Sequence, residues 1–250
     1  MLVQQTIAGL PAPRPLLLHE TALFLDLDGT LAPLAARPQD VRPLARRTVL
    51  LDRLAGELGG RLAVVSGRTL KDIDRILEDR VAAVAAVHGL VRREPDGRIC
   101  KVEPHPGLDV AIGGFQSFAS DDPGLIVEVK SDVSVALHFR QAPRLAGAAK
   151  ALARTLAAQT GLALQDGDMV QELRAPGPDK GDSVRAFMSQ SPFVGAWPVF
   201  VGDDETDEKG FSAARDLGGI GVIVGSMRKT AAQFRLADVE AALRWLEAAS

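Results

Sequence analysis

The sequence predicts an α/β protein in which a doubly wound, Rossmann-like parallel sheet carries a smaller, inserted α+β segment. Short apolar runs alternate with helical stretches in the first and last parts of the chain, which is typical of a parallel sheet covered by helices. The middle of the chain alternates apolar and polar residues one by one, which favours antiparallel strands. A length of 250 residues accommodates one large domain together with a smaller one.

The predicted strands of the main sheet are short apolar runs that end in polar or glycine-containing segments, as buried strands do. They cover residues 22–25, 62–65, 82–87, 199–201 and 220–224. Helices are predicted between and after them, over residues 41–58, 69–77, 180–188 and 206–214. Because strands from both ends of the chain contribute to one sheet, we assign residues 1–103 and 175–250 to the core and residues 104–174 to the insert.

The insert contains a predicted hairpin, because residues 125–130 and 133–140 alternate in polarity and only Ser131 and Asp132 separate them. It continues with a helix and two strands, over residues 145–159, 162–165 and 169–174.

The two faces of this hairpin differ chemically, since side chains alternate across a strand. The polar face holds Glu128, Lys130, Ser134, His138 and Arg140. The apolar face, which the predicted helix should cover, holds Val127, Val129, Val133, Val135, Leu137 and Phe139. The polar face has two open interpretations: it contacts a ligand, or it is a solvated outer surface.

Composition and charge exclude several classes of function. The formal net charge of −3 leaves no basic excess for a nucleic-acid backbone or an anionic membrane surface. The single cysteine, Cys100, cannot form an internal disulfide, which favours a reducing compartment. The first twenty residues lack a charged n-region, and their apolar run Leu16–Leu18 is too short for a signal peptide. We therefore expect a cytoplasmic protein, monomeric and without a macromolecular partner.

Carboxylates gather at the ends of two predicted strands. Asp26 and Asp28 follow the first strand two residues apart, so that their side chains point the same way toward the crevice of the sheet. A later strand runs into residues 202–208, Gly-Asp-Asp-Glu-Thr-Asp-Glu, whose density of oxygen ligands favours a hard cation.

Two further strand ends or helix starts carry groups that suit an anion. Ser66 precedes a helix whose first N–H groups are unpaired, and Lys180 opens another helix, where the positive end of the dipole disfavours a cation. Each segment alone also fits a turn, a helix cap, a surface lysine or a solvated acidic loop. Because all of them would meet at the carboxyl ends of the strands, together they predict one site.

The order Asp26-x-Asp28-Gly29-Thr30, Ser66, Lys180 and Gly202-Asp203-Asp204 resembles the four motifs of the haloacid dehalogenase (HAD) phosphohydrolases. Finer strings are similar to those of the trehalose-6-phosphate phosphatases: residues 25–33, 66–68, 88–89, 179–181 and 202–208, with 128–130 and 138–140 in the insert. The resemblance covers roughly residues 22–226. The chain departs from that family at two places. It has Phe139 where the family has tyrosine, and it has Arg174-Ala175-Pro176 where the family has an arginine-proline pair.

The resemblance implies Mg²⁺-dependent hydrolysis of trehalose 6-phosphate to trehalose and phosphate, the final step of trehalose biosynthesis. It implies Asp26 as nucleophile, Asp28 as acid and base, and Ser66 and Lys180 as phosphoryl ligands. The implied metal residues are Asp26, Asp28 through its carbonyl, Asp203, and Asp204 or Asp207 indirectly. The insert is implied to be a cap, and the substrate-binding residues are Gly67, Arg68, His88, Glu128, Lys130, His138, Arg140 and Glu172.

Other functions share this core chemistry. A phosphatase for sucrose phosphate or mannosyl-phosphoglycerate has the same motifs and differs in the insert. A phosphosugar mutase would return phosphate to the sugar, and a non-catalytic sugar-phosphate sensor would lack a motif residue. We expect the nucleophile Asp26 to have a low pKa and the acid Asp28 to have a raised pKa.

Overall fold

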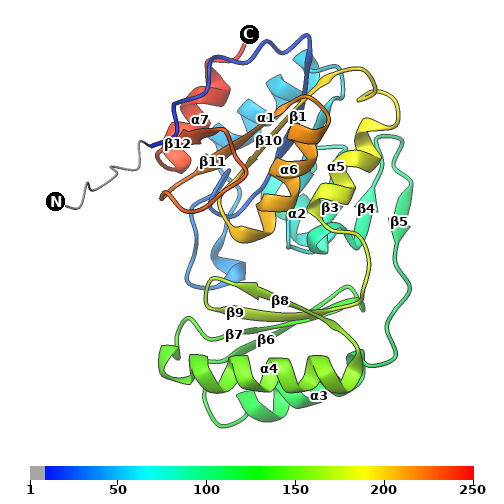
Figure 1. Ribbon diagram of the computed structural model, residues 1–250, viewed down its shortest axis with the longest axis vertical. Helices are drawn as coiled ribbons and strands as arrows, with labels where there is room; N and C mark the ends of the chain where they lie inside the picture. Colours follow the sequence, from blue (N-terminus) through cyan, green and yellow to red (C-terminus); the bar gives the residue numbers. More distant parts are fainter. Residues whose placement is uncertain (1–8) are drawn as a thin grey trace, which may run out of the picture.

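The structure is a computed structural model that describes residues 9–250. An eight-stranded sheet forms its larger part, in the order β12-β11-β10-β1-β2-β3-β4-β5 (Figure 1). Its strands are β1 (Thr21–Leu25), β2 (Leu62–Val65), β3 (Ala83–Ala86), β4 (Val91–Arg93), β5 (Ile99–Lys101), β10 (Trp197–Gly202), β11 (Ile220–Val224) and β12 (Phe234–Leu236). Neighbours from β12 to β3 are parallel, and β4 and β5 are added antiparallel.

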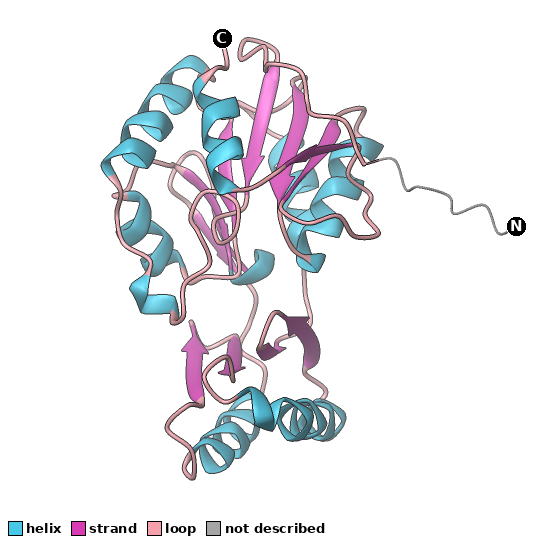
Figure 2. Cartoon of the chain, turned by 90° about the vertical axis from the view of Figure 1, so that its left-hand side faces the viewer, coloured by secondary structure: helices cyan, strands magenta, loops and turns pink. Residues whose placement is uncertain are grey.

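Helices cover both faces of this sheet, because alternate residues of each buried strand point to opposite sides. Leu23 and Leu25 of β1 pack with α1 (Ala45–Glu57), α2 (Leu70–Leu77) and α7 (Val239–Glu247). Ala22 and Phe24 pack with α5 (Lys180–Met188) and α6 (Glu208–Asp216) on the other side. Figure 2 shows the two helical layers with the sheet between them. The predicted doubly wound α/β core is confirmed.

The order of the strands reverses at β1. From β1 the chain proceeds through β2 and β3 toward one edge, whereas β10, which pairs with β1 on its other side, leads through β11 to the opposite edge. In an open α/β sheet the crevice beyond the carboxyl ends of such neighbouring strands is where ligands bind. Here that crevice lies at the end of β1 and β10.

A second sheet, of four antiparallel strands in the order β6-β7-β9-β8, faces that crevice. Its strands are β6 (Ile126–Lys130), β7 (Ser134–His138), β8 (Ala163–Gly167) and β9 (Val170–Arg174). Helices α3 (Leu108–Ala119) and α4 (Ala146–Thr160) cover the face of this sheet that points away from the core (Figure 1). Its own apolar cluster includes Phe115, Leu137 and Leu173.

The apolar face of the hairpin differs from the prediction at two valines. Val129 is 47% exposed, and Val133 packs into the apolar cluster of the large sheet rather than beneath α3 and α4. Val129 lies on the edge strand β6, and Val133 lies in the turn between β6 and β7. Leu137 and Phe139 are buried against those helices as predicted.

Several elements were not predicted. Helix α3 contains Gly113 and Gly114, which weaken a helical pattern, and β4, β5 and β12 are only three residues long. The helix expected over 206–214 is divided into a 3-10 turn, Glu205–Asp207, and α6. None of the helices within residues 9–250 is both long and apolar enough to cross a membrane.

Candidate active site

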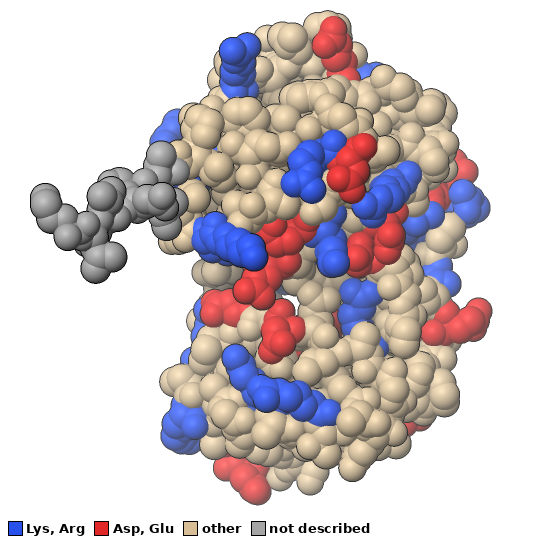
Figure 3. Space-filling view, viewed as in Figure 1, with Lys and Arg blue, Asp and Glu red and all other residues tan. Residues whose placement is uncertain are grey.

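A cleft between the two sheets collects the predicted site residues. Its empty space, the open mouth included, is about 1090 Å³. Figure 3 shows acidic and basic side chains along the hollow between the two parts of the molecule. Every site residue predicted from the sequence lines this cleft except Asp207, which is fully buried behind it.

Asp26 and Lys180 form the base of the cleft. Lys180, the first residue of α5, donates to Asp26 Oδ1 at 2.8 Å and to Asp207 Oδ1 at 2.7 Å, and all three side chains are buried. Burial lowers the pKa of Lys180, but the charges of Asp207 and Asp26 raise it well above its usual value. Lys180 is therefore a permanent cation beside Asp26, which explains its place at a helix N-terminus.

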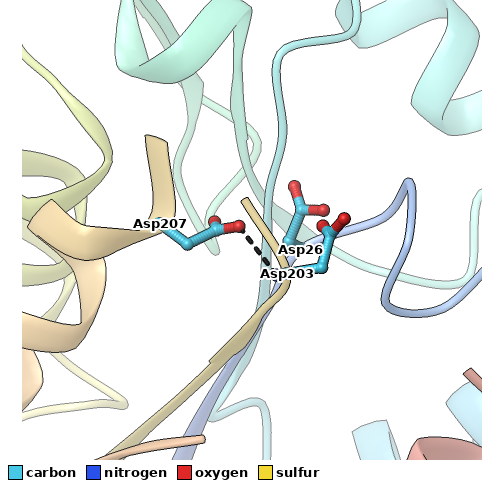
Figure 4. Close-up of side chains that lie close together, drawn as sticks. All are labelled: Asp26, Asp203 and Asp207. Atoms are coloured by element: carbon cyan, nitrogen blue, oxygen red, sulfur yellow. Dashed lines mark hydrogen bonds between the residues drawn. The ribbon is translucent and has the colours of Figure 1, made fainter. Parts of the chain in front are cut away.

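Three carboxylates converge at this point. Figure 4 shows Asp26, Asp203 and Asp207, which each place an oxygen within 4.8 Å of the others. Burial and the charges of Asp207 and Asp204 raise the pKa of Asp203 to about 8. Burial raises the pKa of Asp26 well above its usual value. The charge of Lys180 opposes this shift, and the charges of Asp207 and Asp203 add to it. The protein groups alone thus do not give Asp26 the low pKa we expected, and a cation among these carboxylates would lower it.

Asp207 and Asp204 have different partners. Asp207 Oδ2 accepts from the backbone N–H groups of Asp203 and Asp204 at 3.0 and 3.1 Å, so Asp207 fixes the acidic loop to Lys180. Asp204 caps the 3-10 turn and accepts from the Thr206 N–H and hydroxyl at 2.8 and 2.6 Å. Of the side chains predicted for a metal, those of Asp204 and Asp28 lie outside the three-carboxylate cluster.

Asp28 faces Arg68 across the cleft floor. Arg68 Nε lies 2.5 Å from Asp28 Oδ2, and Arg68 Nη2 lies 2.8 Å from Asp28 Oδ1. The third nitrogen, Nη1, donates to the Pro38 carbonyl at 2.8 Å. Arg68 was predicted to bind substrate, and in the structure its guanidinium holds a carboxylate and a backbone carbonyl.

The loop after β2 carries Ser66 and Gly67 and packs against His88. Ser66 is buried, and its hydroxyl accepts from the Arg68 N–H at 3.3 Å. A Cβ on Gly67 would lie 2.4 Å from the His88 ring, so only glycine allows this approach. His88 Nε2 lies 3.4 Å from Glu172 Oε2, and burial, opposed by Glu172, lowers the pKa of His88.

Glu172 and Lys130 form a buried pair on the polar face of the small sheet. Lys130 Nζ donates to Glu172 Oε2 at 2.6 Å, and the Ser134 hydroxyl donates to Oε1 at 2.6 Å. Burial would raise the pKa of Glu172, but Lys130 and His88 hold it well below its usual value. This polar face therefore lines the cleft and is not a solvated outer surface.

The remaining polar residues of the hairpin pair within the small sheet. His138 Nε2 lies 2.8 Å from Glu128 Oε2, and Arg140 Nη2 lies 2.9 Å from Asp168 Oδ2. Phe139 is buried in the apolar cluster under the sheet and does not line the cleft.

Sequence reasoning missed two segments of the cleft wall. One is the loop after β1, residues 34–38, and the other is the end of β8 with the residue after it, residues 165–168, together with Val170 at the start of β9. Neither contains a motif, although the Gly-Asp pair at 167–168 between two alternating runs indicated a hairpin end. It also missed Arg228, which donates to the Asp204 carbonyl and pairs with Glu208 and so holds the acidic loop from outside.

The chain is similar to known phosphatases in sequence and in fold. A family model described as trehalose-phosphatase matches residues 24–240. The chain is 36% identical over 236 residues to the trehalose-6-phosphate phosphatase of Escherichia coli (strain K12), which covers 93% of this chain and 88% of that protein. The fold of this chain is similar to that of the C-terminal domain of C. albicans trehalose-6-phosphate phosphatase. The TM-score is 0.84 at 21% identity, over 96% of this chain and 98% of that one. A HAD-superfamily phosphatase from Bacteroides thetaiotaomicron shares the fold at a TM-score of 0.60 and 15% identity, over 92% and 93% of the two chains.

Proposed function

The chain belongs to the trehalose-phosphatase family, and on that premise we propose that it hydrolyses trehalose 6-phosphate to trehalose and phosphate, the last step of trehalose biosynthesis. It is accordingly a phosphoric monoester hydrolase. The observation that carries the proposal is the buried contact of 2.8 Å between Asp26 and Lys180 at the carboxyl end of β1, beside two further carboxylates. A nucleophile, a fixed cation and a set of metal ligands are thereby assembled at one point of the cleft.

We assign the metal as Mg²⁺, held by Asp26 and Asp203. The donors are carboxylate oxygens, which suit a hard cation that keeps several waters. Gly29 supports this fit, since a Cβ there would lie 2.0 Å from Asp203 Oδ2. When bound, Mg²⁺ would neutralise the negative charge between the phosphate dianion and Asp26. Asp207, whose oxygens accept from Lys180 and two N–H groups, would position Asp203 and Lys180 rather than bind the ion.

In the first step a carboxylate oxygen of Asp26 forms a bond to phosphorus while the bond between phosphorus and the sugar oxygen breaks, and the Asp28 carboxyl gives its proton to that oxygen. In the second step the Asp28 carboxylate takes a proton from water. The water oxygen bonds to phosphorus while the bond to Asp26 breaks, which releases phosphate. Lys180 and Ser66 would hold the phosphoryl oxygens throughout.

We propose that residues 104–174 act as the cap domain that selects the sugar over the core formed by residues 1–103 and 175–250. In support, Glu128, Lys130 and Glu172 line the cleft, and their charges suit sugar hydroxyls. Gly67, Arg68, His88, His138 and Arg140 complete the cleft wall around the proposed substrate. We further propose a cytoplasmic monomer, which size-exclusion chromatography and cell fractionation test.

A side-by-side screen of sugar phosphates with Mg²⁺ tests the proposal. Trehalose 6-phosphate should give the highest kcat/KM, and sucrose phosphate and mannosyl-phosphoglycerate much lower values. The phosphoryl group should be released as inorganic phosphate and should not be returned to a sugar. This result would distinguish a hydrolase from a mutase. Turnover of another sugar phosphate in preference to trehalose 6-phosphate would assign a different substrate to the same chemistry.

A further inference from the structure

Arg68 makes three contacts through its guanidinium, which use three of its five N–H donors. Nε and Nη2 contact the two carboxylate oxygens of Asp28 at 2.5 and 2.8 Å, and Nη1 donates to the Pro38 carbonyl at 2.8 Å. The planar fork of arginine matches a carboxylate in this bidentate way and fixes its orientation as well as its position. Arg68 is 8% exposed, so these contacts are shielded from solvent.

The backbone of Arg68 is itself held rigidly. Its N–H donates to the Ser66 hydroxyl at 3.3 Å, and its carbonyl accepts from the Val87 N–H at 2.9 Å. The next residue, Thr69, caps α2 through the Asp72 N–H at 3.1 Å. The guanidinium therefore projects from an ordered loop at the start of a helix, which suits a residue that positions another side chain.

We propose that Arg68 is a positioning residue for Asp28, which fixes the carboxyl group that donates and later accepts the proton in the reaction. Asp28 has no other side-chain hydrogen-bond partner within residues 9–250, and its side chain is 28% exposed to the cleft. Without Arg68 its carboxyl group is free to rotate, and misplacement of an acid by about 1 Å costs about a hundredfold in rate. The inference rests on the proposed phosphatase function.

The alternative role for Arg68, a direct phosphate ligand, makes a different kinetic prediction. A sugar alkoxide is a poor leaving group and needs the proton from Asp28, whereas 4-nitrophenolate leaves as a stable anion and needs it little. Loss of an acid-positioning residue therefore penalises the sugar phosphate selectively. Loss of a phosphate ligand penalises both substrates equally.

The experiment measures single-turnover release of trehalose and of 4-nitrophenol, which isolates the first step. Arg68→Met and Arg68→Lys should each slow trehalose release about a hundredfold and slow 4-nitrophenol release less than about tenfold. Asp28→Asn should show the same selectivity, and the double variant Arg68→Met with Asp28→Asn should be no slower than Asp28→Asn alone. The matched control is Arg75→Met, which removes the contact of 3.1 Å to the Val41 carbonyl in the same region and does not touch Asp28.

Two results would overturn the inference and favour Arg68 as a direct phosphate ligand. One is an equal loss of rate on both substrates, and the other is a double variant whose loss of rate is the product of the two single losses. Arg68→Lys keeps the charge, so the test survives if Arg68→Met does not fold. If the parent enzyme releases phosphate from neither substrate, the proposed function fails. If the parent uses both and only the selectivity is missing, the inference alone fails.

Discussion

Lys130 Nζ of the small sheet lies 3.0 Å from the carbonyl oxygen of Gly67, in the loop that follows β2 of the large sheet. Its second partner is Glu172 Oε2 at 2.6 Å, within the small sheet. The contact crosses the cleft and ends on the residue that follows Ser66. The lysine proposed to read the sugar therefore also supports the loop proposed to hold the phosphoryl group.

We expect Lys130→Met to lower kcat/KM roughly tenfold to a hundredfold on trehalose 6-phosphate, because charged, buried hydrogen bonds contribute about 1.5 to 3 kcal/mol. Unlike a residue that contacts only the sugar, Lys130 should also matter for 4-nitrophenyl phosphate, since the Gly67 loop loses its support. The control is Glu128→Gln on the same strand, which pairs with His138 and not with the core. It should lose activity on the sugar phosphate alone. A Lys130→Met enzyme unimpaired on 4-nitrophenyl phosphate would show that the contact with Gly67 has no role in catalysis.

Asp26→Asn keeps the shape of the nucleophile and removes the charge that attacks phosphorus. Turnover should fall by several orders of magnitude, and no phosphoenzyme should be trapped by acid quench. Burial raises the pKa of Asp26, so its ionised form destabilises the folded protein when no metal is bound. In the absence of metal, the Asp26→Asn variant should therefore be at least as thermally stable as the parent. Near-normal turnover, together with no trappable aspartyl phosphate in the parent, would contradict the role of Asp26.

Removal of Mg²⁺ should abolish turnover and expose a pH dependence of stability. The pKa of Asp203 is raised from 3.8 to about 8, and that of Asp207 is raised from 3.8 to about 6. At a pH between the ordinary and the raised pKa of each carboxyl, the folded protein therefore binds more protons than the unfolded chain. In EDTA the Tm should therefore fall as the pH rises from about 5 to about 8. Scanning fluorimetry at both pH values measures it.

Added Mg²⁺ should raise the Tm more at the higher pH, because protons compete with the cation for the same carboxylates. The control variant Asp203→Asn should weaken both effects. A Tm in EDTA that is independent of pH, or full activity with metal shown to be absent, would count against the carboxylate site.

Gly29 tests the geometry of the same carboxylates. Its φ of +83° disfavours any other residue, and an added Cβ would lie 2.0 Å from Asp203 Oδ2. Gly97 has a φ of +87° with nothing within 4 Å of an added Cβ, so Gly97→Ala carries the backbone cost of about 1 kcal/mol alone. Gly29→Ala should lose Mg²⁺ affinity in calorimetry as well as stability, whereas Gly97→Ala should lose stability only. Equal Mg²⁺ affinities in the two variants would argue against Asp203 as a ligand.

Local pattern predicted much of the site, because motif residues occur where strands end. Apolar runs predicted the parallel strands, and in an α/β sheet their carboxyl ends must meet at one edge, which placed Asp26, Ser66 and Asp203 together. Lys180 joins them from the first position of α5, which follows the small sheet. The residue types at these positions then indicated a cation and a phosphate. The short strands β4, β5 and β12 and the glycine-containing α3 escaped prediction, because their stability comes from tertiary packing rather than from their own pattern.

The sequence by itself determined the fold class, since this follows from periodicity and from the order of strands, and its motifs indicated the charged residues of the cleft but not the wall formed by residues 34–38 and 165–168. Only the tertiary structure decided which of these side chains pair. It joined Arg68 to Asp28, Lys130 to Gly67 and Asp207 to Lys180, over separations of 40, 63 and 27 residues. Such pairs depend on how loops from different strands converge and on which rotamers the packing allows, and neither is encoded in the local spacing of residues.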